Sequence, residues 1–121
     1  MKGRPTTAAE RRFHDALCSL GCIACRIDGR RDVPATVHHI DGRTKPWAHW
    51  LVLPLCAGHH QEGTGAPGLI PVHPWKPRFE LTYGRQPLLL AQCLDLMEHQ
   101  QLHVPPEARR AANGRWARMV A

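Results

Sequence analysis

Cysteine and histidine side chains recur in this sequence as two pairs with the same spacing. Cys22 and Cys25 are separated by two residues, and so are Cys56 and His59. A tight turn can aim both members of such a pair at one ion, and Zn²⁺ in structural sites takes four sulfur or nitrogen ligands. The two pairs therefore predict a tetrahedral zinc site. The alternative is a set of buried free cysteines beside a hydrogen-bonded histidine.

Two pairs of adjacent histidines supply more ligands than one zinc ion needs. His38 and His39 lie in a short β-branched run that could form a strand, where neighbouring side chains point to opposite faces. His60 follows His59 on an expected helix and is rotated from it by about 100°. His38 and His60 can therefore converge on a second ion. His39 would then face a water molecule as a general base, because imidazole titrates near neutral pH.

Local signals predict the elements that must position these residues. Thr7 and Glu10 have the spacing of a capping box that opens a helix, and Pro87 suits the first turn of another. Residues 63–77 contain three glycines and four prolines, which predicts an irregular loop. We expect the other elements in this order: a knuckle over residues 22–29, strands over 35–40 and 50–54, a short helix with His59 and His60, and a helix over 75–83.

Length and composition limit the class of protein. A chain of 121 residues suggests one domain over residues 1–121, with a core small enough to benefit from a structural metal. Its five cysteines are an odd number, which argues against a fully paired disulfide framework. No run approaches the ~20 apolar residues of a membrane span, and no apolar segment follows the basic first residues. We therefore expect a cytoplasmic protein with reduced cysteines and no membrane partner.

Positive charge is concentrated at the two ends of the chain. The formal net charge is +6, of which residues 1–12 and residues 105–121 each carry +3, while the segment between them is neutral. Basic ends around a neutral centre suit contact with the phosphates of a nucleic acid. The alternative is a solvated surface that only aids solubility.

Several further cysteines and histidines fit ordinary packing or surface positions. We expect helix-core positions for Cys18 and Cys93, and helical surface positions without a chemical role for His14, His99 and His103. Three tryptophans flank the expected site, as packing residues or as platforms for unpaired bases: Trp47, Trp50 and Trp75.

The ordered motifs resemble the HNH, or ββα-metal, nucleases, and more closely the phage Ref-type, RecA-dependent nucleases. The stretches that carry the resemblance are residues 20–25, 38–46, 53–60, 63–68 and 72–75, with further matches up to residue 84. Several separate motifs in order make the resemblance specific. It implies an α+β fold with a small zinc-stabilised treble-clef or ββα-metal core over about residues 20–84 and flanking helices.

The resemblance also implies roles for individual residues. His39 matches the general base, and His38 and His60 match ligands of the catalytic metal. Cys22, Cys25, Cys56 and His59 match the structural zinc set. The position of the family's last histidine is Thr64 here, so His73 is the candidate for a displaced ligand, with a turn cap as the alternative.

Two residues near His39 have less specific matches. His49 lies near the family's central Asn or His position, where it could orient His39, touch the substrate or do neither. Asp41 could be an alternative ligand or an orienting carboxylate, although Asp before Gly is also a common turn residue.

The implied activity is that of a metal-dependent DNA endonuclease, encoded by a phage, linked to recombination and acting in the bacterial host cytoplasm. Mg²⁺ or Mn²⁺ is the expected working ion, although an all-imidazole site also binds Zn²⁺. Arg43 and Lys45 would hold phosphates of the DNA.

The implied partner is a RecA filament. The family leads one to expect a long basic N-terminal region, whereas about twenty residues precede Cys22 in this sequence. The basic ends would take its place, or the partner interaction would differ. The other interpretation is a non-catalytic, zinc-stabilised DNA- or protein-binding module that uses only the two pairs with equal spacing.

Overall fold

A two-stranded antiparallel hairpin occupies the centre of the computed structural model, which describes residues 3–63 and 68–114. Strand β1 (Thr36–His39) pairs with β2 (Val52–Leu55), so that His39 lies opposite Val52 and Thr36 lies opposite Leu55. All four residues of β2 are buried, whereas only His38 of β1 is fully buried. The fold is α+β, as expected, and the ends of the strands lie within two residues of their predicted positions.

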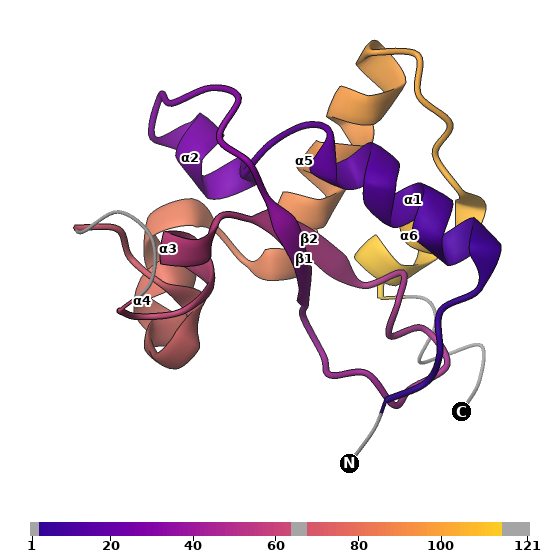
Figure 1. Ribbon diagram of the computed structural model, residues 1–121, viewed down its shortest axis with the longest axis horizontal. Coiled ribbons are helices and arrows are strands. Elements are labelled where there is room, and N and C mark those ends of the chain that lie inside the picture. Colours follow the sequence, from indigo (N-terminus) through magenta and orange to yellow (C-terminus); the bar gives the residue numbers. More distant parts are fainter. Residues whose placement is uncertain (1–2, 64–67, 115–121) are drawn as a thin grey trace.

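Helices surround this hairpin. Figure 1 shows α3 and α4 on one side of it and α1, α5 and α6 on the other. The helices are α1 (Ala8–Cys18), α2 (Ile23–Ile27), α3 (Ala57–His60), α4 (Val72–Tyr83), α5 (Gln86–His99) and α6 (Pro106–Ala112). Within the described residues, no helix has the length and apolar character needed to cross a membrane.

Helices α1 and α5 hold the buried face of β2. The predicted capping box begins α1, since Thr7 accepts a hydrogen bond from the Glu10 amide at 3.1 Å and Glu10 accepts one from the Thr7 amide at 2.8 Å. Leu17 of α1 and Leu94 of α5 are fully buried in the same core as β2. Each large apolar side chain buried there contributes about 1.5–3 kcal/mol. This core fixes the hairpin that carries His38 and His39.

The structure corrects two element predictions. The expected knuckle over residues 22–29 contains the short helix α2, because the sulfur of Cys22 caps it by accepting from the Cys25 amide at 3.4 Å. Helix α4 begins at Val72, inside the segment predicted as loop, and it is kinked by non-helical backbone at His73 and Trp75. Burial of Val72 and Phe79 outweighs the local effect of the prolines.

Two further expectations concern single side chains. Cys93 is buried in the core, as predicted, whereas Cys18 at the end of α1 is partly exposed. Trp50 is a packing residue: it is 7% exposed and its ring centroid lies 5.6 Å from that of Phe13. Thr64 lies outside the described residues, and so do three residues of the basic ends, Lys2, Arg115 and Arg118.

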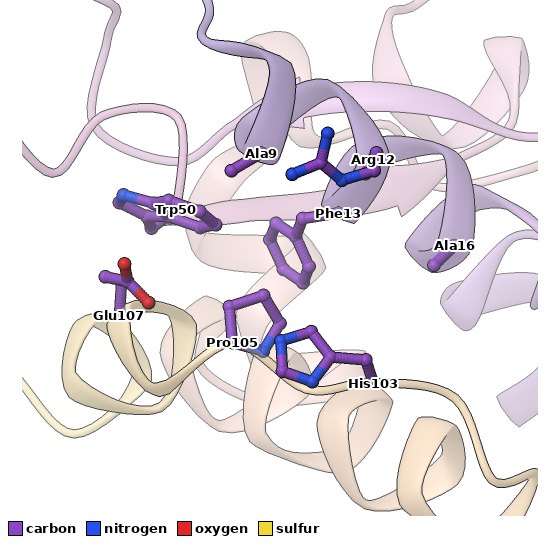
Figure 2. Close-up of a pocket in the computed structure, with 8 residues that line it drawn as sticks. All are labelled: Ala9, Arg12, Phe13, Ala16, Trp50, His103, Pro105 and Glu107. Carbon is purple, nitrogen blue, oxygen red and sulfur yellow. The ribbon is translucent and has the colours of Figure 1, made fainter.

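A hollow of about 270 Å³ lies beside this tryptophan. Figure 2 shows that its lining comes from α1, from Trp50, from the segment between α5 and α6, and from Glu107 of α6. None of its lining residues belongs to either of the two groups of metal-binding side chains described below.

Candidate metal centres and active site

The first cluster joins the N-terminal end of α2 to α3. Its four members are buried, and their ligand atoms lie within 4.8 Å of one another: Cys22, Cys25, Cys56 and His59. Cys22 and Cys56 are the N-cap residues of the two helices, so each pair projects into the same space from the first turn of its helix. The structure thus brings together the two pairs that the sequence singled out.

The distances within this cluster suit a bound ion better than hydrogen bonds. The Nδ1 atom of His59 lies 3.4 Å from the sulfurs of Cys22 and Cys25 and 3.3 Å from that of Cys56. One ring nitrogen cannot make hydrogen bonds to three thiols at once. By contrast, Zn–S and Zn–N bonds of about 2.3 and 2.0 Å place tetrahedral corners about 3.5–3.8 Å apart. The cluster could therefore hold a metal ion such as zinc.

The other ring nitrogen of His59 is occupied by protein groups. Nε2 lies 3.0 Å from the hydroxyl of Tyr83 and 3.3 Å from Oδ2 of Asp28, and the Tyr83 hydroxyl donates to the same Oδ2 at 2.8 Å. A carboxylate accepts but does not donate, so Nε2 carries the proton and Nδ1 is left for the ion. Sequence reasoning missed Asp28 and Tyr83, because neither lies at a ligand spacing.

Burial affects the thiols of this cluster. It raises the pKa of Cys22 and Cys25 above the ordinary value, because the charged form is desolvated. Only thiolates bind metal, so an ion entering the cluster must displace protons. Metal binding here is therefore coupled to both pH and folding.

The second cluster contains only imidazoles. His38 from β1, His60 from α3 and His73 from the start of α4 bring ring nitrogens within 4.8 Å of one another. The structure thus brings together the three histidines that the sequence assigned to a second ion. The extended backbone of His73 pairs with Gln61, and its carbonyl accepts from the Glu62 amide at 2.8 Å. These backbone contacts hold His73 against the end of α3, and the group could hold a metal ion.

His38 is oriented by α5. Its Nε2 atom lies 2.8 Å from Oε1 of Gln86, and the Gln86 side-chain amide donates to Oε2 of Glu80 at 3.3 Å. The Glu80 carboxylate can only accept, so the Gln86 oxygen must face His38 and His38 must carry its proton on Nε2. Nδ1 of His38 is then the nitrogen available to an ion. Gln86 is 1% exposed and was missed from the sequence, where it reads only as the start of a helix.

Burial keeps His38 in the form that binds metal. It is 2% exposed, and desolvation lowers its pKa to about 4, against the opposing effect of the Gln86 hydrogen bond. The ring is therefore neutral at physiological pH, and a neutral imidazole is the ligand form.

The two ring nitrogens of His39 have different surroundings. Its Nε2 atom lies 2.9 Å from Nδ1 of His49, whereas its own Nδ1 is buried and has no hydrogen-bond partner in the described part of the chain. Desolvation, followed by the charge of Arg43, lowers the pKa of His39 to about 4. A buried unpaired nitrogen is costly in a folded protein, which is one sign of a functional atom.

One depression joins His39 to the imidazole cluster. A cavity of about 310 Å³ is lined by His38, His39, His60 and His73 together with Arg43. A molecule in this cavity can therefore contact the residues of the imidazole cluster, His39 and Arg43 at the same time.

His49 lies behind His39, at 4% exposure. Its Nε2 atom lies 2.6 Å from the carbonyl oxygen of Arg4, and its own carbonyl accepts from Nε2 of His14 at 2.7 Å. The structure thus places His49 against the ring of His39, away from the cavity lining. It also corrects the expectation for His14, whose ring contacts His49 from α1 and has a T-shaped contact with His39.

The remaining candidates lie on the surface. The carboxylate of Asp41 accepts from Lys45 at 2.6 Å, and Asp41 belongs to neither metal group. The Lys45 ammonium also lies 5.9 Å from the ring centroid of Trp47. Of the two predicted phosphate contacts, Arg43 lines the cavity and Lys45 does not.

Most of the chain matches a known protein family. The model of a family described as "Recombination enhancement, RecA-dependent nuclease" matches residues 6–98. The matched segment extends from the start of α1 into α5 and contains both candidate metal clusters, His39 and His49. The chain therefore belongs to this family of RecA-dependent nucleases.

Proposed function

We propose that this chain is a metal-dependent DNA endonuclease of the HNH, or ββα-metal, type that acts in recombination. The observation that carries the proposal is the shared cavity, which His39 lines together with three candidate metal ligands, while Nδ1 of His39 is buried without a partner among the described residues. The succession β1, β2 and α3 around the cavity is consistent with a ββα-metal core. Membership of the nuclease family supports the substrate class.

In the proposed reaction, Nδ1 of His39 accepts a proton from a water molecule. The water oxygen attacks the phosphorus of a DNA phosphodiester, and the bond to the 3′-oxygen breaks. Arg43, at the cavity wall, would contact the phosphate. A divalent ion held by His38, His60 and His73 would stabilise the negative charge that develops on the phosphate and the leaving oxygen.

We propose Mg²⁺ or Mn²⁺ as the working ion and Zn²⁺ as the structural ion. Three imidazoles also bind Zn²⁺ strongly, so zinc can occupy the catalytic position without being the turnover metal. The Cys₃His cluster ties α2 to α3 and so supports the helix that carries His60.

The proposed partners are DNA and a RecA filament. The family description names the RecA dependence. The exposed basic residues Arg4, Arg11 and Arg12 precede and begin α1, where they suit contact with DNA phosphates. Asp41 is given no role in the reaction, because its carboxylate pairs with Lys45.

DNA cleavage tests this function. The zinc-loaded chain is incubated with supercoiled and single-stranded DNA, with and without a RecA filament, in Mg²⁺, Mn²⁺ or EDTA. We expect cleavage only with a divalent ion, greater cleavage on RecA-coated DNA, and loss of activity in His60→Ala but not in the exposed control His99→Ala. DNA binding without cleavage under all these conditions would favour the non-catalytic binding module.

A further inference from the structure

We propose that the main-chain carbonyl of Arg4 acts through His49 to position the general base, by fixing the ring protons so that Nδ1 of His39 stays unprotonated. The inference rests on the proposed nuclease function of His39. It makes the segment just before α1 a positioning part of the active site, in addition to any contact its side chains make with DNA.

The first step concerns His49. Its Nε2 atom lies 2.6 Å from the Arg4 carbonyl oxygen, which can accept a hydrogen bond but cannot donate one. Nε2 of His49 must therefore carry a proton. In a neutral imidazole the other nitrogen has a lone pair, so Nδ1 of His49 is an acceptor.

The second step transfers this constraint to His39. Its Nε2 atom lies 2.9 Å from the acceptor Nδ1 of His49, so Nε2 of His39 must be the protonated nitrogen. The opposite assignment would set two lone pairs against each other. Nδ1 of neutral His39 is then the basic atom, and it is the buried nitrogen without a partner in the described residues. After it accepts a proton, the Nε2–H group can still donate to His49.

The third step concerns what holds Arg4 in place. Its amide donates to the carbonyl of Arg43 at 2.8 Å, so Arg4 is tied by its main chain both to His49 and to a residue that lines the cavity. A Cβ atom added at Gly3 would collide with Cβ of Arg43. The segment can therefore lie this close only with glycine at this position. His14 holds the other side of His49 by donating to its carbonyl at 2.7 Å.

Long-range ¹H–¹⁵N NMR of the zinc-loaded, full-length chain in Mg²⁺ tests the tautomers at pH 8, where ordinary imidazoles are neutral. We expect the Nε2–H tautomer for both His39 and His49. A His39 that carries its proton on Nδ1 would overturn the proposal. This readout does not depend on cleavage. A chain that cuts no DNA would refute the nuclease function, and the tautomers would still test the effect of the Arg4 carbonyl on His49 and His39.

Three variants separate the Arg4 carbonyl from the Arg4 side chain. Deletion of residues 2–5 places Met1 in the position of Pro5, so that no carbonyl remains at position 4, and Gly3→Ala displaces the carbonyl without changing charge. Both should lower kcat by about 10- to 100-fold, the usual effect of losing a residue that orients a site. The matched control, Lys2→Ala with Arg4→Ala, removes both side-chain charges and keeps the carbonyl, so it should raise KM for DNA and preserve kcat.

The variants also have a structural readout. His39 should lose its single tautomer in the deletion and in Gly3→Ala, while zinc content and melting temperature report whether each variant folds. Unchanged kcat and unchanged tautomers in the folded deletion variant would overturn the proposal. So would a kcat loss in the double-alanine control equal to that in the deletion.

Discussion

The Nε2 atom of His38 lies 2.8 Å from the Oε1 atom of Gln86, and this contact joins the imidazole cluster to a buried residue in the first turn of α5. Glu80 fixes the direction of the Gln86 amide, because its carboxylate can only accept from the amide nitrogen. The orientation of a candidate metal ligand thus depends on a residue 48 positions away in the sequence.

The Gln86→Leu variant should bind Mn²⁺ about 10- to 100-fold more weakly, because His38 loses the partner that fixes its tautomer and ring direction. Isothermal titration calorimetry measures this affinity. Gln92→Leu, an exposed change on the same helix, is the matched control and should leave the affinity unchanged. Equal Mn²⁺ affinity in the wild type and Gln86→Leu would refute the orienting role.

Removal of zinc should unfold the chain. Structural zinc contributes about 10–16 kcal/mol in small zinc domains, which equals or exceeds the roughly 5–15 kcal/mol of net stability in a typical domain. We expect Cys25→Ser to lose zinc and cooperative melting, whereas Cys18→Ser, a partly exposed change outside the cluster, should retain both. Metal analysis and circular dichroism measure these properties, and a folded, zinc-free Cys25→Ser protein would contradict the structural role.

Stability should fall in mild acid because of His38. Burial lowers its folded-state pKa to about 4 from the ordinary 6.5, so between these values the unfolded chain binds more protons than the folded chain. This contribution is complete above pH 6.5 and is lost as the pH falls towards 4, by about 3 kcal/mol in total. We therefore expect the unfolding free energy of the wild type minus that of His38→Gln to fall on acidification. Urea titration without added Mg²⁺ or Mn²⁺ measures both values.

Both proteins are compared only over the pH range in which metal analysis shows that they retain the structural zinc, so that the contribution of zinc is common to both. A difference that is the same at pH 7 and at the lowest pH of this range would mean that His38 does not titrate as a buried group.

The separation of the adjacent histidines into two groups followed from periodicity. Adjacent residues on a strand face opposite ways and adjacent helical residues differ by about 100°, so His38 separates from His39 and His59 from His60. The structure has this separation, with His59 among the cysteines and His60 beside His38. Local geometry is enough for such a prediction because it depends only on the type of element.

The partners of these residues could not be predicted in the same way. Arg4 and His49 are 45 residues apart, and His14 and His49 are 35 apart, so their contacts depend on how the segment before α1 and α1 itself pack beside the hairpin. Periodicity gives the face of an element but not what packs against it. For the same reason α2 and the start of α4 were missed, since the burial of Ile23 and Val72 stabilises them against weak local signals.

The most direct test of the central claim is the rate of Mg²⁺- or Mn²⁺-dependent DNA cleavage by His39→Ala, in protein that retains its zinc, its fold and its affinity for DNA. Loss of a general base should lower this rate by about 10²- to 10⁴-fold. A His39→Ala protein that cleaves DNA as fast as the wild type would contradict the assignment of His39 as the group that activates water.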